Sequence, residues 1–250
     1  MKKTLFLFVA ILFANVTFSQ TSFGVRVGLN SATLSGKESS EDKTDYKAVN
    51  GMVFGAVVEQ HATDMLSVQF ELLYLQKGAQ GESSATTLLG PMNYTFKMYL
   101  NSIELPILLK ATFGDNLKFY GNAGPYFNYA LGGKHELKTV INNATETTNG
   151  KVIFKKEPDN YKGDDNYYDP DEYNRLDWGL YFGGGLGMHL GPGLLSLDIR
   201  YGLGFSSFYK DAHFDKVQLD GSTKNIVPDG YEAFKNRNLT ISLSYMFGGE

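Results

Sequence analysis

The sequence predicts an all-β fold, an eight-stranded antiparallel up-and-down barrel that spans a membrane. Eight strand-length segments alternate between apolar and small or polar side chains, one face of every segment lacks charge, and the links between segments alternate in length. A period of two residues is the repeat of a β-strand. The segments are Phe23 to Leu29, Met52 to Val58, Leu66 to Tyr74, Ile103 to Phe113, Leu117 to Leu131, Leu176 to Leu190, Leu195 to Ser207 and Leu239 to Phe247.

The last segment shows the alternation, because Leu239, Ile241 and Leu243 point to one side while Thr240 and Ser242 point to the other. No Asp, Glu, Lys or Arg occupies the apolar register of any segment, although 20% of the chain is charged. The apolar face therefore meets either lipid or a dry core.

A soluble barrel of the lipocalin type is the main alternative, because its eight strands also alternate but turn the apolar face inward. Its outer wall would then be the second register, which is rich in glycine and small polar residues such as Gly28, Gly124, Gly183, Asn122 and Ser242. A wall that faces water normally carries more Lys and Glu, whereas a narrow lumen needs small side chains. The sequence therefore favours the membrane barrel.

The links between segments fall into two classes. Short links at Ala62 to Asp64, Gly114 to Asn116 and Gly191 to Gly193 are rich in residues that favour turns. The long links hold most of the charge and run over Ser31 to Asn50, Gly78 to Thr95, Gly133 to Arg175 and Tyr209 to Asn236. Outer-membrane barrels have short periplasmic turns and long external loops. We therefore expect four mobile external loops.

The N-terminus predicts a cleaved secretory signal over residues 1–19, followed by a barrel domain over residues 20–250. Lys2 and Lys3 precede an apolar run from Leu5 to Ala14, and small residues stand just before Gln20. This order is typical of a signal peptide. The run is too short to cross a bilayer as a helix, which needs about 20 residues. The chain is therefore predicted to be exported through the inner membrane and to lie in the cell outer membrane.

The composition excludes several kinds of partner and cofactor. The formal net charge is −4, and the chain has no cysteine. An acidic chain lacks the basic surface that phosphate backbones require, so we expect no nucleic-acid partner. The absence of cysteine excludes disulfides, iron–sulfur clusters and thiolate zinc sites. We expect no cofactor, and we expect outer-membrane lipid around a monomeric barrel.

Three stretches of the sequence share features with a known family, namely residues 23–36, Ile103 to Lys110 and Arg237 to Phe247. They resemble stretches of the PorT-like outer-membrane β-barrel family of the Bacteroidetes. In architecture the resemblance extends over the whole mature chain. It implies an outer-membrane location, and the proteins that this chain resembles are often labelled porins. One member of the group serves the type IX secretion machinery. The long acidic link from Gly133 to Arg175 matches no motif of the group.

The inward register of the predicted strands holds four acidic and four basic residues: Arg26, Glu59, Glu71, Glu104, Lys110, Lys118, Asp198 and Arg200. A closed eight-stranded barrel has room only for side chains, so these charges are expected to pair inside the lumen. Ordinary register would place Arg26 and Glu59 at similar depth. The cluster is interpreted either as a structural polar plug or as a gate or proton path.

Other residues of the predicted strands bear on the shape of the lumen. Tyr120, Tyr126 and Tyr181 share its inward face and would narrow any channel. Pro106 and Pro125 lie inside strands, where proline cannot donate to the ladder, and therefore predict β-bulges. Passage of sugars or antibiotics through the monomer is not expected.

The third long link interleaves carboxylates with tyrosines, and we interpret it as a recognition loop that contains Tyr161, Asp164, Asp165, Tyr167, Tyr168, Asp169, Asp171 and Tyr173. Carboxylates gathered in this way could hold Ca²⁺, but their spacing is not that of an EF-hand, and no metal site is assigned. Tyrosine buries contact area at low entropic cost. We therefore expect a protein or glycan partner at the external loops.

No catalytic residue is assigned, and the chain is predicted not to be an enzyme. Of its histidines, His61 flanks a short link and His189 faces inward near the same end, whereas His135 and His213 lie in long links. A lipid hydrolase would need a histidine beside a serine nucleophile and an acidic partner. Ser206 and Ser207 are near His213 in sequence, but nothing in the sequence fixes their geometry.

The sequence thus predicts a non-enzymatic outer-membrane protein that acts through its external loops in surface or envelope interactions. A PorT-like component of a type IX secretion machinery is the first alternative. A narrow ion-conducting pore is the second.

Overall fold

The computed structural model describes residues 21–37, 46–87, 90–142, 144–155, 167–168, 173–209, 215–217, 223–225 and 232–248. The predicted signal segment, residues 1–19, lies outside these ranges. Among the residues described, none forms a helix long and apolar enough to cross a membrane.

The described residues form strands that vary widely in length. They are β1 (Thr21–Lys37), β2 (Val49–His61), β3 (Leu66–Thr87), β4 (Gly90–Phe113), β5 (Leu117–Ile141), β6 (Ala144–Ile153), β7 (Tyr167–Tyr168), β8 (Leu176–Leu190), β9 (Gly193–Gly204), β10 (Asp215–Val217), β11 (Thr223–Asn225) and β12 (Glu232–Gly248).

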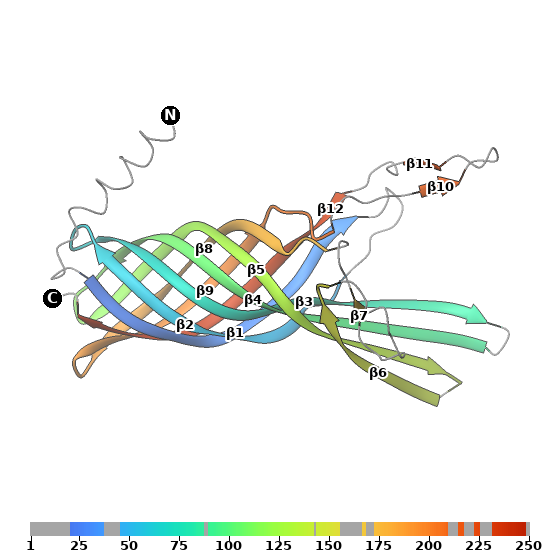
Figure 1. The fold of residues 1–250 in the computed structure, drawn as a ribbon. Helices are drawn as coiled ribbons and strands as arrows, with labels where there is room; N and C mark the ends of the chain where they lie inside the picture. The colour runs from blue at the N-terminus through green and yellow to red at the C-terminus, as the bar shows by residue number, and fades with distance from the viewer. Residues whose placement is uncertain are drawn as a thin grey trace.

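Eight of these strands close into a ring (Figure 1). They pair antiparallel in the order β1, β2, β3, β4, β5, β8, β9 and β12, and β12 pairs with β1. The remaining strands lie in the connections between β5 and β8 and between β9 and β12. Because each strand of the ring pairs with the ring strands before and after it in the chain, the topology is up-and-down. The predicted eight-stranded antiparallel barrel is confirmed.

The two faces of the ring differ as the alternation predicts. Val25, Leu105 and Leu243 belong to the apolar register and are exposed on the outer wall. Asn30 and Ser242 belong to the second register and are buried in the lumen. A soluble monomer rarely exposes so large an apolar surface. An apolar band around a polar interior is the pattern of a transmembrane barrel.

The two ends of the ring also differ. The turns at residues 62–65, 114–116 and 191–192 lie at one end, together with the start of β1 and the finish of β12, and we call this the turn end. At the opposite end, which we call the loop end, the hairpins β3–β4 and β5–β6 project well beyond the ring (Figure 1). The three predicted short links are therefore the turns of the turn end.

The prediction that the long links are loops is wrong for much of their length. β1 continues to Lys37, β3 pairs with β4 out to Thr87 and Gly90, and β5 pairs with β6 out to Ile141 and Ala144. The sequence search followed the alternation of a strand in a membrane. That alternation ends where the strands leave the barrel, although backbone hydrogen bonding between them continues.

Four strands continue past the rim as a single antiparallel sheet, which we call the outer sheet. It consists of residues 78–87 of β3, 90–101 of β4, 133–141 of β5 and 144–153 of β6. A register shift between Asn101 and Ser102 marks the point where it begins on β4. The predicted bulges at Pro106 and Pro125 do not occur, because the strand register runs unshifted past both residues. A proline removes one hydrogen bond from the ladder without adding a residue to the strand.

Close approach inside the lumen gives a first testable prediction at Gly185. The hydroxyl of Tyr120 donates to the carbonyl of Leu197 (3.3 Å), so the ring lies over Gly185. A Cβ at Gly185 would overlap Leu197 O and stand 2.5 Å from the Tyr120 hydroxyl oxygen. We expect Gly185→Ala to lower the free energy of unfolding by about 1–3 kcal/mol, as overpacking does.

Equilibrium urea unfolding in lipid vesicles would measure this change. Gly121→Ala is the matched control, because a Cβ there would meet only Gly183 O, at 3.8 Å. Equal stability of the two variants would contradict the packing of Tyr120 on Gly185.

Candidate functional site

The middle of the lumen holds a buried cluster of four alternating charges. Arg26 Nη2 lies 3.1 Å from Glu71 Oε1, and Arg26 Nη1 lies 3.2 Å from Asp198 Oδ1. Arg200 closes the cluster, with Nη1 2.8 Å from Glu71 Oε2 and Nε 2.6 Å from Asp198 Oδ1. Asn122 Nδ2 donates a further hydrogen bond to Asp198 (2.9 Å). Two acidic and two basic groups therefore neutralise one another across the barrel axis.

A second cluster lies nearer the loop end and is centred on Lys77. Lys77 Nζ lies 2.7 Å from Glu104 Oε2 and 3.3 Å from Asp177 Oδ2. The hydroxyl of Tyr181 donates to Glu104 (2.7 Å), and that of Tyr126 donates to Asp177 (3.2 Å). Lys77 also stands over the ring of Tyr126, 4.4 Å from its centroid. This cluster sets one cation against two carboxylates.

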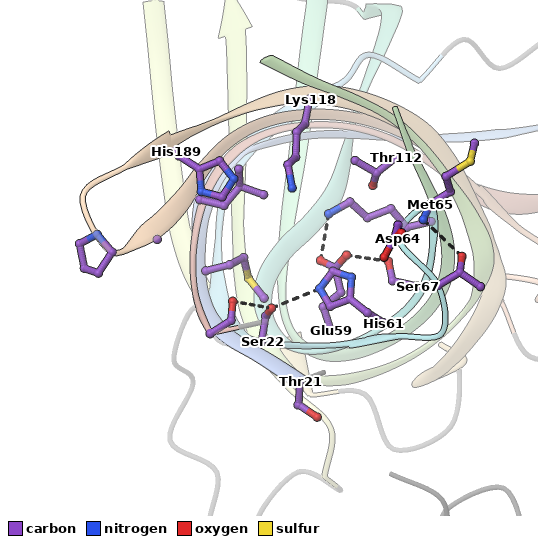
Figure 2. Close-up of a pocket in the computed structure, with 17 residues that line it drawn as sticks. Thr21, Ser22, Glu59, His61, Asp64, Met65, Ser67, Thr112, Lys118 and His189 are labelled. Carbon is purple, nitrogen blue, oxygen red and sulfur yellow. Dashed lines mark hydrogen bonds and ion pairs between the residues drawn. The ribbon is translucent and has the colours of Figure 1, made fainter. Parts of the chain in front are cut away.

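The lowest charges of the lumen lie near the turn end. Lys110 Nζ donates to Glu59 Oε2 (2.9 Å), and Ser67 Oγ donates to the other oxygen of the same carboxylate (2.6 Å). Lys118 lies close by and is only half-buried. Figure 2 shows Lys118 and Glu59 on opposite walls of a cavity that opens at this end.

An apolar cap closes the lumen at the loop end, in the part of the chain that the structure describes. It consists of Leu34, Ala79, Met98, Leu100, Ala130, Val152, Tyr173, Phe208 and Phe234. Tyr173 and Phe208 stack with ring centroids 5.0 Å apart. The cap and the charge clusters thus occupy the lumen between the loop end and the turn end.

The outer sheet has one apolar and one polar face. Phe96 pairs with Leu137, and their side chains lie on the same face as the cap residue Met98. Phe96 remains 37% exposed and Leu137 36% exposed. The other face carries the ion pair between Lys97 and Glu136, with nitrogen and oxygen 3.6 Å apart. The sheet therefore continues the amphipathic pattern beyond the rim and leaves its apolar face in part uncovered.

A second ion pair lies at the base of the outer sheet. Lys47 Nζ lies 2.7 Å from Glu82 Oε2, and the backbone of Lys47 pairs with that of Gln80. The hydrogen bond from Lys47 holds the pKa of Glu82 below its ordinary value. Because both side chains are exposed, we attribute little stability to this pair.

The structure places the predicted lumen charges in the barrel interior but groups them differently. Arg26 and Glu59 do not share a depth, because Glu59 stands opposite Ser22 and binds Lys110, whereas Arg26 reaches Glu71 and Asp198. Lys118 joins none of the clusters. The sequence suggested that charges on adjacent strands would pair. The long arginine side chains instead reach across the lumen to carboxylates on strands that are not adjacent.

Two members of the upper cluster, Lys77 and Asp177, were missed by sequence reasoning. Asp177 is the second residue of the predicted segment from Leu176 and lies in its inward register. Lys77 lies three residues beyond the predicted segment that ends at Tyr74. A complete list of the charges in the inward register would have included Asp177, and extending the other segment by three residues would have found Lys77.

The structure describes only part of the predicted recognition loop. Tyr167 and Tyr168 form β7, which pairs parallel with Val152 and Ile153 of β6. Tyr173 is 8% exposed and belongs to the apolar cap, so it is not available as a contact residue. The other predicted members, namely Tyr161, Asp164, Asp165, Asp169 and Asp171, lie outside the described residues.

The histidines that the structure describes lie at two separate places on the barrel. His61 and His189 line the cavity at the turn end, whereas His135 stacks on Phe96 in the outer sheet. His213 lies outside the described residues, and with it the serine–histidine arrangement considered above. Within the described ranges, no group of three or more His, Asp or Glu side chains could hold a metal ion.

A closed ring of eight antiparallel strands, with an apolar outer wall and a charged lumen, defines a transmembrane β-barrel. Residues 15–210 match the outer membrane protein beta-barrel domain, and the chain belongs to this family. Its location is therefore the outer membrane. No curated protein matches the sequence significantly.

Solved structures of several small outer-membrane proteins are similar to this chain. The attachment invasion locus protein Ail of Yersinia pestis is 15% identical, with 91% of this chain and 99% of Ail covered and a TM-score of 0.35. Neisserial surface protein A is 14% identical, with 90% and 96% covered and a TM-score of 0.37. OprG of Pseudomonas aeruginosa is 11% identical, with 92% and 97% covered and a TM-score of 0.43. The fold of this chain rests on its own strand pairing.

Proposed function

We propose that this protein is a non-enzymatic outer-membrane protein that binds a protein or glycan partner through its loop end, which faces the outside of the cell. The observation that carries the proposal is the partly exposed apolar face of the outer sheet, at Phe96 and Leu137. Buried aromatic and aliphatic anchors supply most of the binding energy of interfaces. A hydrogen-bonded sheet presents such anchors rigidly, which lowers the entropic cost of binding.

The orientation follows from the lengths of the connections. Outer-membrane barrels place short turns in the periplasm and long connections outside. The turn end of this barrel holds the three short turns, and the outer sheet rises from the opposite end (Figure 1). The outer sheet would then meet partners at the cell surface.

Cells that display the protein would test the proposal by their binding to arrays of glycans and of surface proteins. We expect the double variant Phe96→Ser/Leu137→Ser to lose the binding that the parent shows. The matched control is Lys97→Ser/Glu136→Ser, which alters the opposite face of the same two strands and should retain binding. Equal binding by both variants would contradict a role for the apolar face.

The resemblance to PorT-like proteins supports a second candidate, a component of a secretion machinery. Deletion of the gene would then leave exported proteins stranded in the periplasm. If that outcome were found and the parent protein bound nothing on the arrays, the role in secretion would replace the proposed role in surface binding.

Conductance measurements would distinguish a surface-binding protein from an ion-conducting pore. The apolar cap and the lumen charge clusters place paired and packed side chains across the axis of the barrel. We therefore expect the purified protein to give no stepwise ion conductance in planar bilayers. Regular current steps that change when Glu71 or Glu104 is neutralised would identify a pore instead.

A further inference from the structure

A cavity of about 850 Å³ lies on the barrel axis at the turn end. Residues from all eight strands of the ring line it, from Thr21 on β1 to Met246 on β12. Its volume is within the range of small-molecule sites, roughly 300–1,000 Å³. The outer sheet lies at the other end of the molecule, so this cavity is separate from the proposed recognition surface.

One of the charged side chains that line the inner part of the cavity has no partner of opposite charge in the described part of the barrel. The Lys110 ammonium is committed to Glu59, whose carboxylate also accepts from Ser67. Lys118 has no ion pair among the residues that the structure describes, and it is half-buried. Figure 2 shows its side chain directed into the cavity from the wall opposite Glu59. The inner part of the cavity therefore carries one uncompensated positive charge.

The other charge clusters of the lumen do not neutralise this charge. The middle cluster is neutral, with Arg26 and Arg200 against Glu71 and Asp198. The excess negative charge lies higher up, in the Lys77 cluster near the loop end. Because low-dielectric walls focus the field of fixed charges, the unpaired Lys118 favours an anion in the inner part of the cavity.

The remaining lining suits an anion that carries an apolar body. His61 and His189 offer ring N–H groups, and Thr112 offers a hydroxyl. Met65, Leu194 and Met246 supply apolar surface. The acidic group Asp64 also lines the cavity, but it belongs to the turn at its rim. A charged group held at Lys118 would thus have its apolar part against methionine and leucine side chains.

We propose that this cavity binds a small organic anion, a carboxylate or a phosphate monoester, whose charged group contacts Lys118. The same chemistry is present in soluble organic anions and in the headgroups of anionic phospholipids in the leaflet around the turn end. The proposal is independent of the surface-binding function, because neither the outer sheet nor the apolar cap contributes to the cavity.

Methionine methyl NMR on the full barrel would test the site, because Met65 and Met246 line the cavity and Met98 lies in the distant cap. The detergent should be an uncharged maltoside, since a phosphocholine detergent would itself supply phosphate. The probes are phenyl phosphate, as a soluble anion, and dihexanoylphosphatidic acid, as a lipid headgroup. We expect saturable shifts of Met65 and Met246 and an unchanged Met98 signal.

Lys118→Gln should weaken the binding at least about tenfold, as loss of a charge-assisted contact does. Lys118→Arg should largely preserve it, and Lys138→Gln in the outer sheet is the matched control that should leave it unchanged. Because Lys118 has no ion pair to lose among the described residues, its replacement should not prevent folding.

The two probes distinguish the source of the ligand. Shifts with phenyl phosphate alone indicate a soluble anion, shifts with the lipid alone indicate a headgroup, and shifts with both indicate a site open to either. No saturable shift with either probe, or equal affinity of Lys118→Gln and the parent, would overturn the proposal.

Discussion

Glu71→Gln is expected to lower the free energy of unfolding by about 3–5 kcal/mol, the range for breaking a buried ion pair from one side. Glu71 is buried, and its two oxygens face different guanidinium groups, Arg26 at 3.1 Å and Arg200 at 2.8 Å. Arginine cannot give up its proton inside a protein. The variant would leave two fixed positive charges against the single carboxylate of Asp198, because the two arginines form no ion pair with any other carboxylate among the described residues.

Two further variants separate charge imbalance from loss of packing. Glu71→Gln/Arg200→Gln restores neutrality in the middle cluster, with Arg26 against Asp198, and should recover part of the lost stability. Glu82→Gln removes a carboxylate of an exposed pair and should leave the unfolding curve unchanged. Urea titration in lipid vesicles would give all three values. If the double variant were less stable than Glu71→Gln, the imbalance of charge would not be the cause.

The barrel could be predicted from the sequence because the membrane imposes one simple rule on every strand. Hydrocarbon excludes charge from one register, so residues such as Leu239 and Ile241 define the strand and its outer face together. The same rule predicted which charges point inward. It could not predict how they pair, because Arg26 on β1 binds Glu71 on β3 and Asp198 on β9, each one strand beyond its ladder neighbours.

The outer sheet was not predicted, because the rule that excludes charge from one register does not apply outside the membrane. Beyond the rim both faces of a strand can meet water. Charged residues such as Lys97 and Glu136 can therefore lie on strands, and their presence does not indicate a loop. β6 holds Thr145, Thr147 and Thr148, whose β-branched side chains favour strands, yet its polarity resembles that of a loop. Polarity identifies the end of the membrane; it does not identify the end of a strand.

The cavity was the least predictable feature. Lys118 and Glu59 were assigned to the lumen from their register, and His61 and His189 were placed near the turn end. Which of these side chains share a space depends on the tilt and stagger of the strands around the ring, which follow from the shear of the closed barrel. A list of inward residues on each strand does not contain that information.

Ile199→Arg should lower the free energy of unfolding by about 2–4 kcal/mol, the cost of a basic side chain on the lipid face near the middle of a barrel. Ile199 is 48% exposed on the outer wall and lies midway along the apolar register of β9, beside the buried Arg200. An arginine there has no lumen partner to reach, because its side chain leaves the strand on the opposite face. It must reach the membrane surface along the hydrocarbon or draw water to itself.

Leu190→Arg is the matched control, because Leu190 is equally exposed but stands beside the turn at residues 191–192. A charge near the interface costs only about 0–1 kcal/mol. The single tryptophan, Trp178, lies on the outer wall, so its fluorescence reports insertion during a urea titration into vesicles. If the outer wall faced water, both arginines would be tolerated alike and Ile199→Arg would fold without lipid. A large penalty at Ile199 and a small one at Leu190 is the result that only a hydrocarbon-facing wall produces.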